Sequence, residues 1–132
     1  MSLKREDAKK LTDSILSYSK APECEVSVDM TLAGHTRFAA NDVTTSGSAR
    51  DLAIAVTSRG EGKSGTTRVN DTDAEGLKRA VARSEEMMRA ASVDPEFVEG
   101  LGKQEYPDIR AFHDETQKAG AVERRSGVAS AL

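Results

Sequence analysis

The clearest pattern in the chain is a strict alternation of apolar and polar residues between Cys24 and Leu32. A period of two places one side of the segment in a core and the other in water, which is typical of a half-buried antiparallel strand. The pattern therefore predicts a strand over residues 24–32, and Ala33-Gly34 after it predicts a turn.

Three further strands are predicted downstream. Residues 35–41 form the second, and a loop is expected at residues 46–48, where Ser, Gly and Ser follow one another. Residues 52–57 are apolar or small on both faces, which favours a central strand. A tight hairpin at residues 59–62, which contain two glycines, then leads into a Thr-rich fourth strand over residues 63–69.

Two segments show helical spacing. In residues 5–19 apolar side chains recur at intervals of three and four, and Pro22 marks the end of the helix. The second helix is predicted to begin at a capping box formed by Thr72 and Glu75. Its core stripe is Leu77, Val81 and Met88, with Ala80, Ser84 and Ala91 beside it; the charged residues Arg79, Arg83, Glu85 and Glu86 are expected to cover the remaining surface.

The element order is thus α-β-β-β-β-α, which predicts an α+β fold. We expect one antiparallel sheet of about four strands with two helices packed on one face. Residues 1–93 would form this core domain. Residues 94–132 are predicted to be an extended segment, rich in proline and aromatic residues at first, followed by a weakly helical tail that leads into a further C-terminal domain.

Charge and composition narrow the classes of function. The net charge of -3 provides no electrostatic reason for nucleic-acid binding, and the Arg124-Arg125 pair is interpreted as part of a solvated surface. Neither a membrane-spanning run nor a signal peptide is recognisable, so we expect a cytoplasmic protein without membrane contact. The single cysteine, Cys24, is interpreted as a small buried apolar residue.

No motif predicts catalysis or a bound cofactor in these residues. Gly60, Gly62 and Gly65 match the spacing of a dinucleotide-binding loop, but the residues that follow are β-like, whereas that loop must open a helix. A glycine hairpin is therefore predicted instead. His35 and His113 stand far apart without a second ligand at metal-site spacing, so neither metal ligands nor catalytic residues are assigned.

Several short motifs, taken in order, resemble the amino-terminal domain of the TldD/PmbA family, whose members are also named modulators of DNA gyrase. The similarity covers roughly residues 5–115. It is carried by Arg37-Phe38-Ala39-Ala40-Asn41, Leu52-Ala53-Ile54-Ala55-Val56, the glycines of residues 60–65, Asn70-Asp71-Thr72-Asp73, Asp94-Pro95-Glu96-Phe97, Gly100-Leu101 and Glu105-Tyr106-Pro107.

This resemblance implies a longer parent protein, a zinc metallopeptidase that forms homo- or heterodimers and cleaves unfolded peptides. Its zinc motif would lie in a second domain, so zinc is implied for the parent family and not for these residues. The present chain would be a non-catalytic N-terminal domain that supports the dimer or lines the chamber through which peptides enter. We assign peptide or interface contacts to Arg37, Asn41, Arg68 and Asn70, which are polar and stand near predicted strand ends.

Two alternatives remain open at this point. The chain could be a free-standing protein–protein interaction module without enzymatic activity, which binds a partner through its sheet. A small independent enzyme would need a cleft with perturbed titratable groups, which the sequence does not indicate. These residues alone therefore do not decide whether the chain is part of an enzyme.

Overall fold

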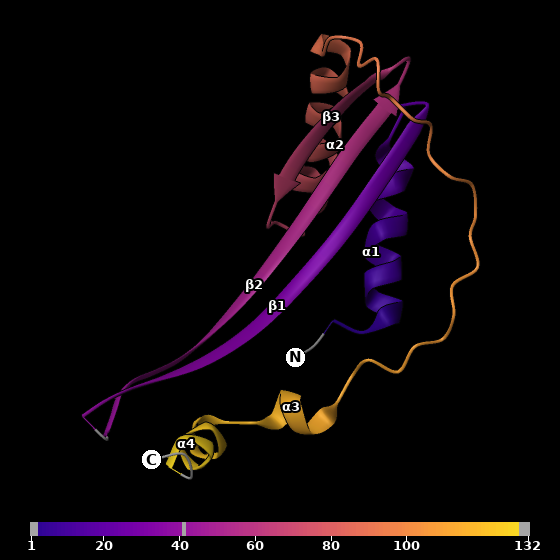
Figure 1. Cartoon of the computed structure of the whole chain (residues 1–132). Coiled ribbons are helices and arrows are strands. Elements are labelled where there is room, and N and C mark those ends of the chain that lie inside the picture. The colour runs from indigo at the N-terminus through magenta and orange to yellow at the C-terminus, as the bar shows by residue number, and fades with distance from the viewer. Residues whose placement is uncertain (1–2, 41, 130–132) are drawn as a thin grey trace. The chain divides into compact units, whose positions relative to one another are not determined.

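The structure is a computed structural model that describes residues 3–40 and 42–129. Figure 1 labels its elements. In chain order they are α1 (Arg5–Tyr18), β1 (Glu23–Ala39), β2 (Asp42–Gly60), β3 (Lys63–Val69), α2 (Ala74–Ala90), α3 (Asp114–Lys118) and α4 (Ala121–Ala129). The described residues divide into two compact units. The helix–sheet unit comprises residues 3–30 and 51–102, and the hairpin unit comprises residues 31–40, 42–50 and 103–129.

The three strands form a sheet in the order β1-β2-β3. Strands β2 and β3 pair antiparallel, from Ile54 opposite Val69 to Gly60 opposite Lys63. The turn between them consists of Glu61 and Gly62, both with positive φ. Because Gly62 has no Cβ, it adopts this left-handed conformation at little cost. The α+β class, the antiparallel sheet and this hairpin turn agree with the sequence-based prediction.

The prediction of four strands was wrong, because two glycines that were interpreted as turn residues lie inside long strands. Gly34 belongs to β1 and Gly47 belongs to β2. A Cβ at Gly47 would lie 2.8 Å from Cε1 of His35, and one at Gly34 would lie 2.7 Å from Nη1 of Arg124. Glycine in a strand interior often marks such a close approach, and here each glycine makes room for a side chain of the hairpin unit.

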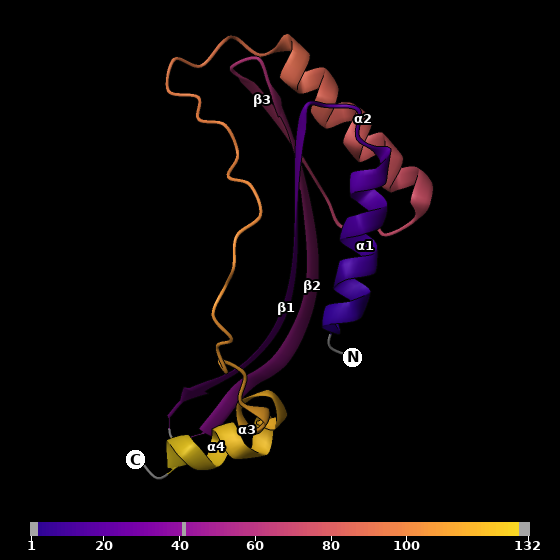
Figure 2. The same ribbon diagram turned by 90° about the vertical axis from the view of Figure 1, so that its right-hand side faces the viewer.

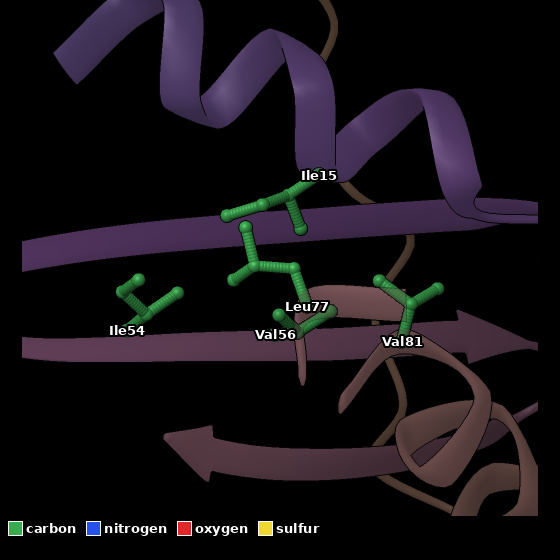
Figure 3. Packing of buried hydrophobic residues seen from close by; sticks show 5 residues of the cluster. All are labelled: Ile15, Ile54, Val56, Leu77 and Val81. Carbon is green, nitrogen blue, oxygen red and sulfur yellow. The ribbon is translucent and has the colours of Figure 1, made fainter. Parts of the chain in front are cut away.

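The core of the helix–sheet unit lies between the helices and β2. Figure 3 shows the five buried side chains of its apolar cluster, Ile15, Ile54, Val56, Leu77 and Val81, which are at most 2% exposed. They come from α1, β2 and α2, and both helices lie on the same side of the sheet in Figure 2. Full burial of an aliphatic side chain contributes about 1.5–3 kcal/mol, so this cluster holds the two helices to the sheet.

Helix α2 approaches the sheet most closely at Gly65 of β3. A Cβ at this position would lie 2.2 Å from the backbone N of Met88 and 2.4 Å from the carbonyl O of Ser84. On β2, Ser58 pairs with Gly65, and its hydroxyl shares a 2.7 Å hydrogen bond with the hydroxyl of Ser84. The third glycine of the predicted hairpin motif is thus explained by helix packing.

The start of α2 differs from the predicted capping box by one residue. The N-cap is Asp73, whose Oδ1 accepts a hydrogen bond from the backbone N–H of Gly76 at 2.8 Å, and not Thr72. A carboxylate at this position also interacts favourably with the positive end of the helix dipole.

Residues 91–102, which follow α2 within the helix–sheet unit, pass around the end of the sheet to the face opposite the two helices (Figure 2). Asp94 donates its backbone N–H to the carbonyl of Gly62 at 2.8 Å. The guanidinium of Arg59 lies 5.0 Å from the centre of the Phe97 ring, and the backbone N–H of Gly100 donates to Glu23 at 3.1 Å. Within residues 3–40 and 42–129, no helix combines the length and the apolar composition needed to cross a bilayer.

Candidate functional site

The sheet face opposite α1 and α2 carries small and polar side chains. Three residue pairs of β2 and β3 lie on it: Ala55–Arg68, Thr57–Thr66 and Arg59–Ser64. The hydroxyls of Thr57 and Thr66 share a hydrogen bond of 2.9 Å across the two strands. The buried apolar cluster of the described residues lies on the other face. Beside the segment that contacts Arg59 through Phe97, this face carries hydrogen-bonding groups that can contact a ligand.

Strand β3 is an edge strand, since β2 is its only neighbour in the described sheet. The outer backbone groups of an edge strand can pair with an added strand of another chain. Arg68 is exposed near the end of β3, and Asn70 is exposed one residue beyond it. These two of the four predicted contact residues thus lie together at one edge.

The other two predicted contact residues belong elsewhere in the chain. Arg37 is an exposed residue of β1 within the hairpin unit, where its carbonyl accepts a 3.4 Å hydrogen bond from Oγ1 of Thr44. Asn41 lies outside the described residues. A role for any of the four in binding stays a prediction.

The hairpin unit contains a cleft of about 1170 Å³ that sequence reasoning missed. It is bounded by residues 32–34, 46–50, 111–113 and 116–121, together with Arg124. Much of its wall consists of Gly, Ala and Ser; its basic side chains are Arg50, Lys118 and Arg124. Arg124 was interpreted as a solvated surface residue, because no local pattern indicates that the tail packs against β1.

Arg124 is held in this cleft by two hydrogen bonds. Its Nε donates to Oγ1 of Thr36 at 3.1 Å, and its Nη1 donates to the carbonyl of Ala119 at 2.9 Å. The side chain of residue 34 leaves space for the guanidinium because it is only a hydrogen atom. The sequence signal for this site is the presence of Gly34 and Gly47 within strands. This signal can be interpreted only when the side chains that face the two glycines, Arg124 and His35, are known.

A second, smaller cavity of about 400 Å³ lies in the helix–sheet unit beside Lys20, Glu85 and Arg89. Glu85 was predicted on the exposed side of α2, but it is only 8% exposed. Its Oε1 accepts the backbone N–H of Lys20 at 2.6 Å, and its Oε2 lies 3.7 Å from Nη1 of Arg89. These partners explain how a carboxylate can be buried here, since a buried charge must be paired and hydrogen-bonded.

The described residues do not fit a catalytic zinc ion. No group of three His, Cys, Asp or Glu side chains within residues 3–40 and 42–129 is placed to hold a metal. Catalytic zinc sites take three protein ligands, and no zinc-dependent step is therefore assigned to these residues.

Part of the chain matches a known protein family in sequence. Residues 24–88, which contain β2, β3, all but the first residue of β1 and most of α2, match the sequence profile described as PmbA/TldA metallopeptidase domain 1. No individual curated protein matches the chain.

Solved structures share the fold at low sequence identity. TldE from Thermococcus kodakarensis is 16% identical with a TM-score of 0.72, over 93% of this chain and 28% of that protein. A protein from Thermotoga maritima, described as a candidate modulator of a DNA gyrase, is 18% identical with a TM-score of 0.67, over 89% and 27%. One of the same description from Bacteroides thetaiotaomicron is 12% identical with a TM-score of 0.66, over 98% and 30%. The chain therefore spans less than a third of the length of each.

Proposed function

The chain carries the first domain of the PmbA/TldD family, and from this premise we propose that it is the non-catalytic N-terminal domain of a zinc metallopeptidase that acts on unfolded peptides. The observation that carries the proposal is the match of residues 24–88 to the first domain of a metallopeptidase family. Zinc and the catalytic residues would come from other parts of the parent protein, because the described residues lack a ligand set.

We assign this domain a role in the dimer or in the wall of the peptide-access chamber. Edge strand β3 supports the assignment, because an extended peptide or a second subunit can add to such an edge through main-chain hydrogen bonds. This mode of binding tolerates varied side chains, which suits an enzyme that acts on unfolded chains. Arg68 and Asn70 would contact the added strand.

The chain alone should therefore bind peptide without cleaving it. We expect a labelled unfolded peptide to bind, as measured by fluorescence anisotropy, and to remain intact when zinc is added. Arg68→Ala and Asn70→Ala should each weaken binding about 3- to 10-fold, as expected for loss of a contact of about 1 kcal/mol. Arg83→Ala is the matched control, because Arg83 is exposed on α2, where its guanidinium lies 3.4 Å from the carboxylate of Glu86.

Zinc-dependent turnover by this chain would contradict the non-catalytic role. Equal binding by the Arg68 and Arg83 variants would contradict the β3 edge as the contact surface. Sedimentation analysis of the chain tests the dimer role separately, since a strictly monomeric species at high concentration would leave only the chamber role.

A free-standing interaction module is the second candidate, and the same open edge of β3 favours it. The gene distinguishes the two: a reading frame that continues past Leu132 into a domain with zinc ligands supports the metallopeptidase, and a stop codon supports the module. Cell fractionation tests the cytoplasmic location that we propose for both.

A further inference from the structure

We propose that the cleft of the hairpin unit binds the carboxylate groups of an extended acidic peptide, with Arg124 as the anchor. The choice of a peptide rests on the proposed function, whereas the preference for acidic residues comes from the cleft itself.

The size and wall of the cleft suit an extended chain. Its volume of about 1170 Å³ exceeds the range of about 300–1,000 Å³ that is typical of small-molecule pockets, which leaves space for several residues of a peptide. The glycines of the wall already face other side chains of the hairpin unit, but the wall also contains several Ala and Ser residues. Such small side chains allow a ligand's backbone to approach the wall closely.

The charge of the cleft selects the ligand. Arg50, Lys118 and Arg124 line it, and none of the described lining residues is Asp or Glu, although the whole chain carries 22 acidic and 19 basic residues. Two acidic side chains next to the cleft have partners of their own. Asp114 lies 3.9 Å from Nζ of Lys118, and Glu123 accepts the backbone N–H of Gly120 at 2.8 Å. The cleft is thus locally basic in an acidic chain.

Arg124 is prepared for a carboxylate because its guanidinium is fixed in place. The hydrogen bonds from Nε to Thr36 and from Nη1 to Ala119 set the plane of the group before a ligand arrives. A guanidinium has five N–H donors, so these bonds leave donors that can pair with carboxylate oxygens. Preorganisation of this kind reduces the entropy lost on binding.

A nucleic acid would also be attracted by basic side chains, but the cleft favours a peptide. Phe112 is the only Phe, Tyr or Trp among the described lining residues, with His113 beside it, whereas single-stranded nucleic acid is usually bound by several stacking aromatics. The net charge of -3 would moreover repel a polyanion, while a short acidic peptide carries less charge.

The test compares two fluorescein-labelled peptides that differ only in Glu or Gln at alternate positions, with the whole chain and anisotropy as the readout. We expect the Glu peptide to bind at least about 10-fold more tightly, and its affinity to fall as salt is raised. Arg124→Gln should remove most of this preference. Arg125→Gln is the matched control, since it removes the same charge from the neighbouring residue, which does not line the cleft, and should change affinity less than about 2-fold.

Because Arg124 also bonds to Thr36 and Ala119, its loss could disturb the fold of the hairpin unit. Ser48→Glu leaves those bonds in place, adds a negative charge to the wall, and should weaken the Glu peptide selectively. Equal binding of the two peptides, or equal effects at residues 124 and 125, would overturn the proposal. So would Arg124-dependent binding of a single-stranded oligonucleotide that exceeds binding of the Glu peptide. Binding that depends on Arg68 but shows no charge preference would overturn this inference and leave the proposed function intact.

Discussion

The backbone N–H of Lys20, just beyond the end of α1, donates to Oε1 of Glu85 on α2 over 2.6 Å. The hydroxyl of Ser19 lies 3.4 Å from the same oxygen, and Arg89 lies 3.7 Å from the other oxygen of the carboxylate. The buried carboxylate of Glu85 on α2 thus accepts a hydrogen bond from a backbone N–H just beyond the end of α1. This contact fixes where the chain leaves α1 and enters β1.

Glu85→Ala should lower the free energy of unfolding by about 2 kcal/mol, because hydrogen bonds to a buried charged group contribute about 1.5–3 kcal/mol. Urea denaturation followed by circular dichroism measures the change. Glu86→Ala is the control: Glu86 is an exposed neighbour whose carboxylate lies 3.4 Å from the guanidinium of Arg83, and its loss should cost less than about 0.5 kcal/mol. Similar costs at both positions would show that the tie between the helices is unimportant.

The sequence predicts the parts of this fold that follow from local periodicity. The alternation from Cys24 to Leu32 lies wholly in β1, and the apolar stripe with Leu77 and Val81 is buried in α2. Local patterns could not show that Gly34 and Gly47 lie within strands, because the space they provide is filled by Arg124 and His35, which come from other segments.

Some residues of the candidate sites could likewise be located from local sequence patterns, and others could not. Arg68 and Asn70 could be placed from the sequence, since a strand followed by a helix cap defines their position. The burial of Glu85 and the cleft around Arg124 depend on tertiary contacts between residues that are 65 and 88 positions apart. No propensity or spacing rule addresses contacts over such distances in the chain.

Gly65→Ala should destabilise the protein by about 2–3 kcal/mol. The new Cβ would overlap the backbone of α2 at Ser84 and Met88, and backbone atoms cannot move aside as a flexible side chain can, so the helix must shift from β3. Gly102→Ala is the control, since nothing lies within 4 Å of the position of its Cβ, and the change should stay within about 0.5 kcal/mol. Thermal unfolding of both variants tests this, and an unchanged Tm for Gly65→Ala would contradict the close packing of α2 on β3.

Asp73 should make the stability of α2 dependent on pH. Its side-chain hydrogen bond with Asp71, followed by the bond from the backbone N–H of Gly76, holds the pKa of Asp73 below its ordinary value. A carboxyl group with a lowered folded pKa stabilises the fold above its unfolded pKa of about 3.9 and loses this effect as pH falls through the folded pKa. The Tm difference between the wild type and Asp73→Asn should therefore be greatest near neutral pH and vanish in acid. An Asp73 pKa at or above the ordinary value in an NMR titration would refute this expectation.

The Ser58–Ser84 pair should show unequal costs when either hydroxyl is removed. Both side chains are fully buried, and their hydroxyls share a 2.7 Å hydrogen bond, but only Ser84 also donates to a carbonyl, that of Val81, at 2.8 Å. Ser84→Ala therefore leaves the Ser58 hydroxyl buried without this partner and should cost about 1–3 kcal/mol, whereas Ser58→Ala leaves Ser84 bonded and should cost less. The double variant should cost less than the two single costs together by at least about 0.5 kcal/mol, because the second substitution removes the group that the first had left unsatisfied. Urea unfolding of the three variants completes this cycle, and strictly additive costs would mean that the two hydroxyls do not interact in the folded protein.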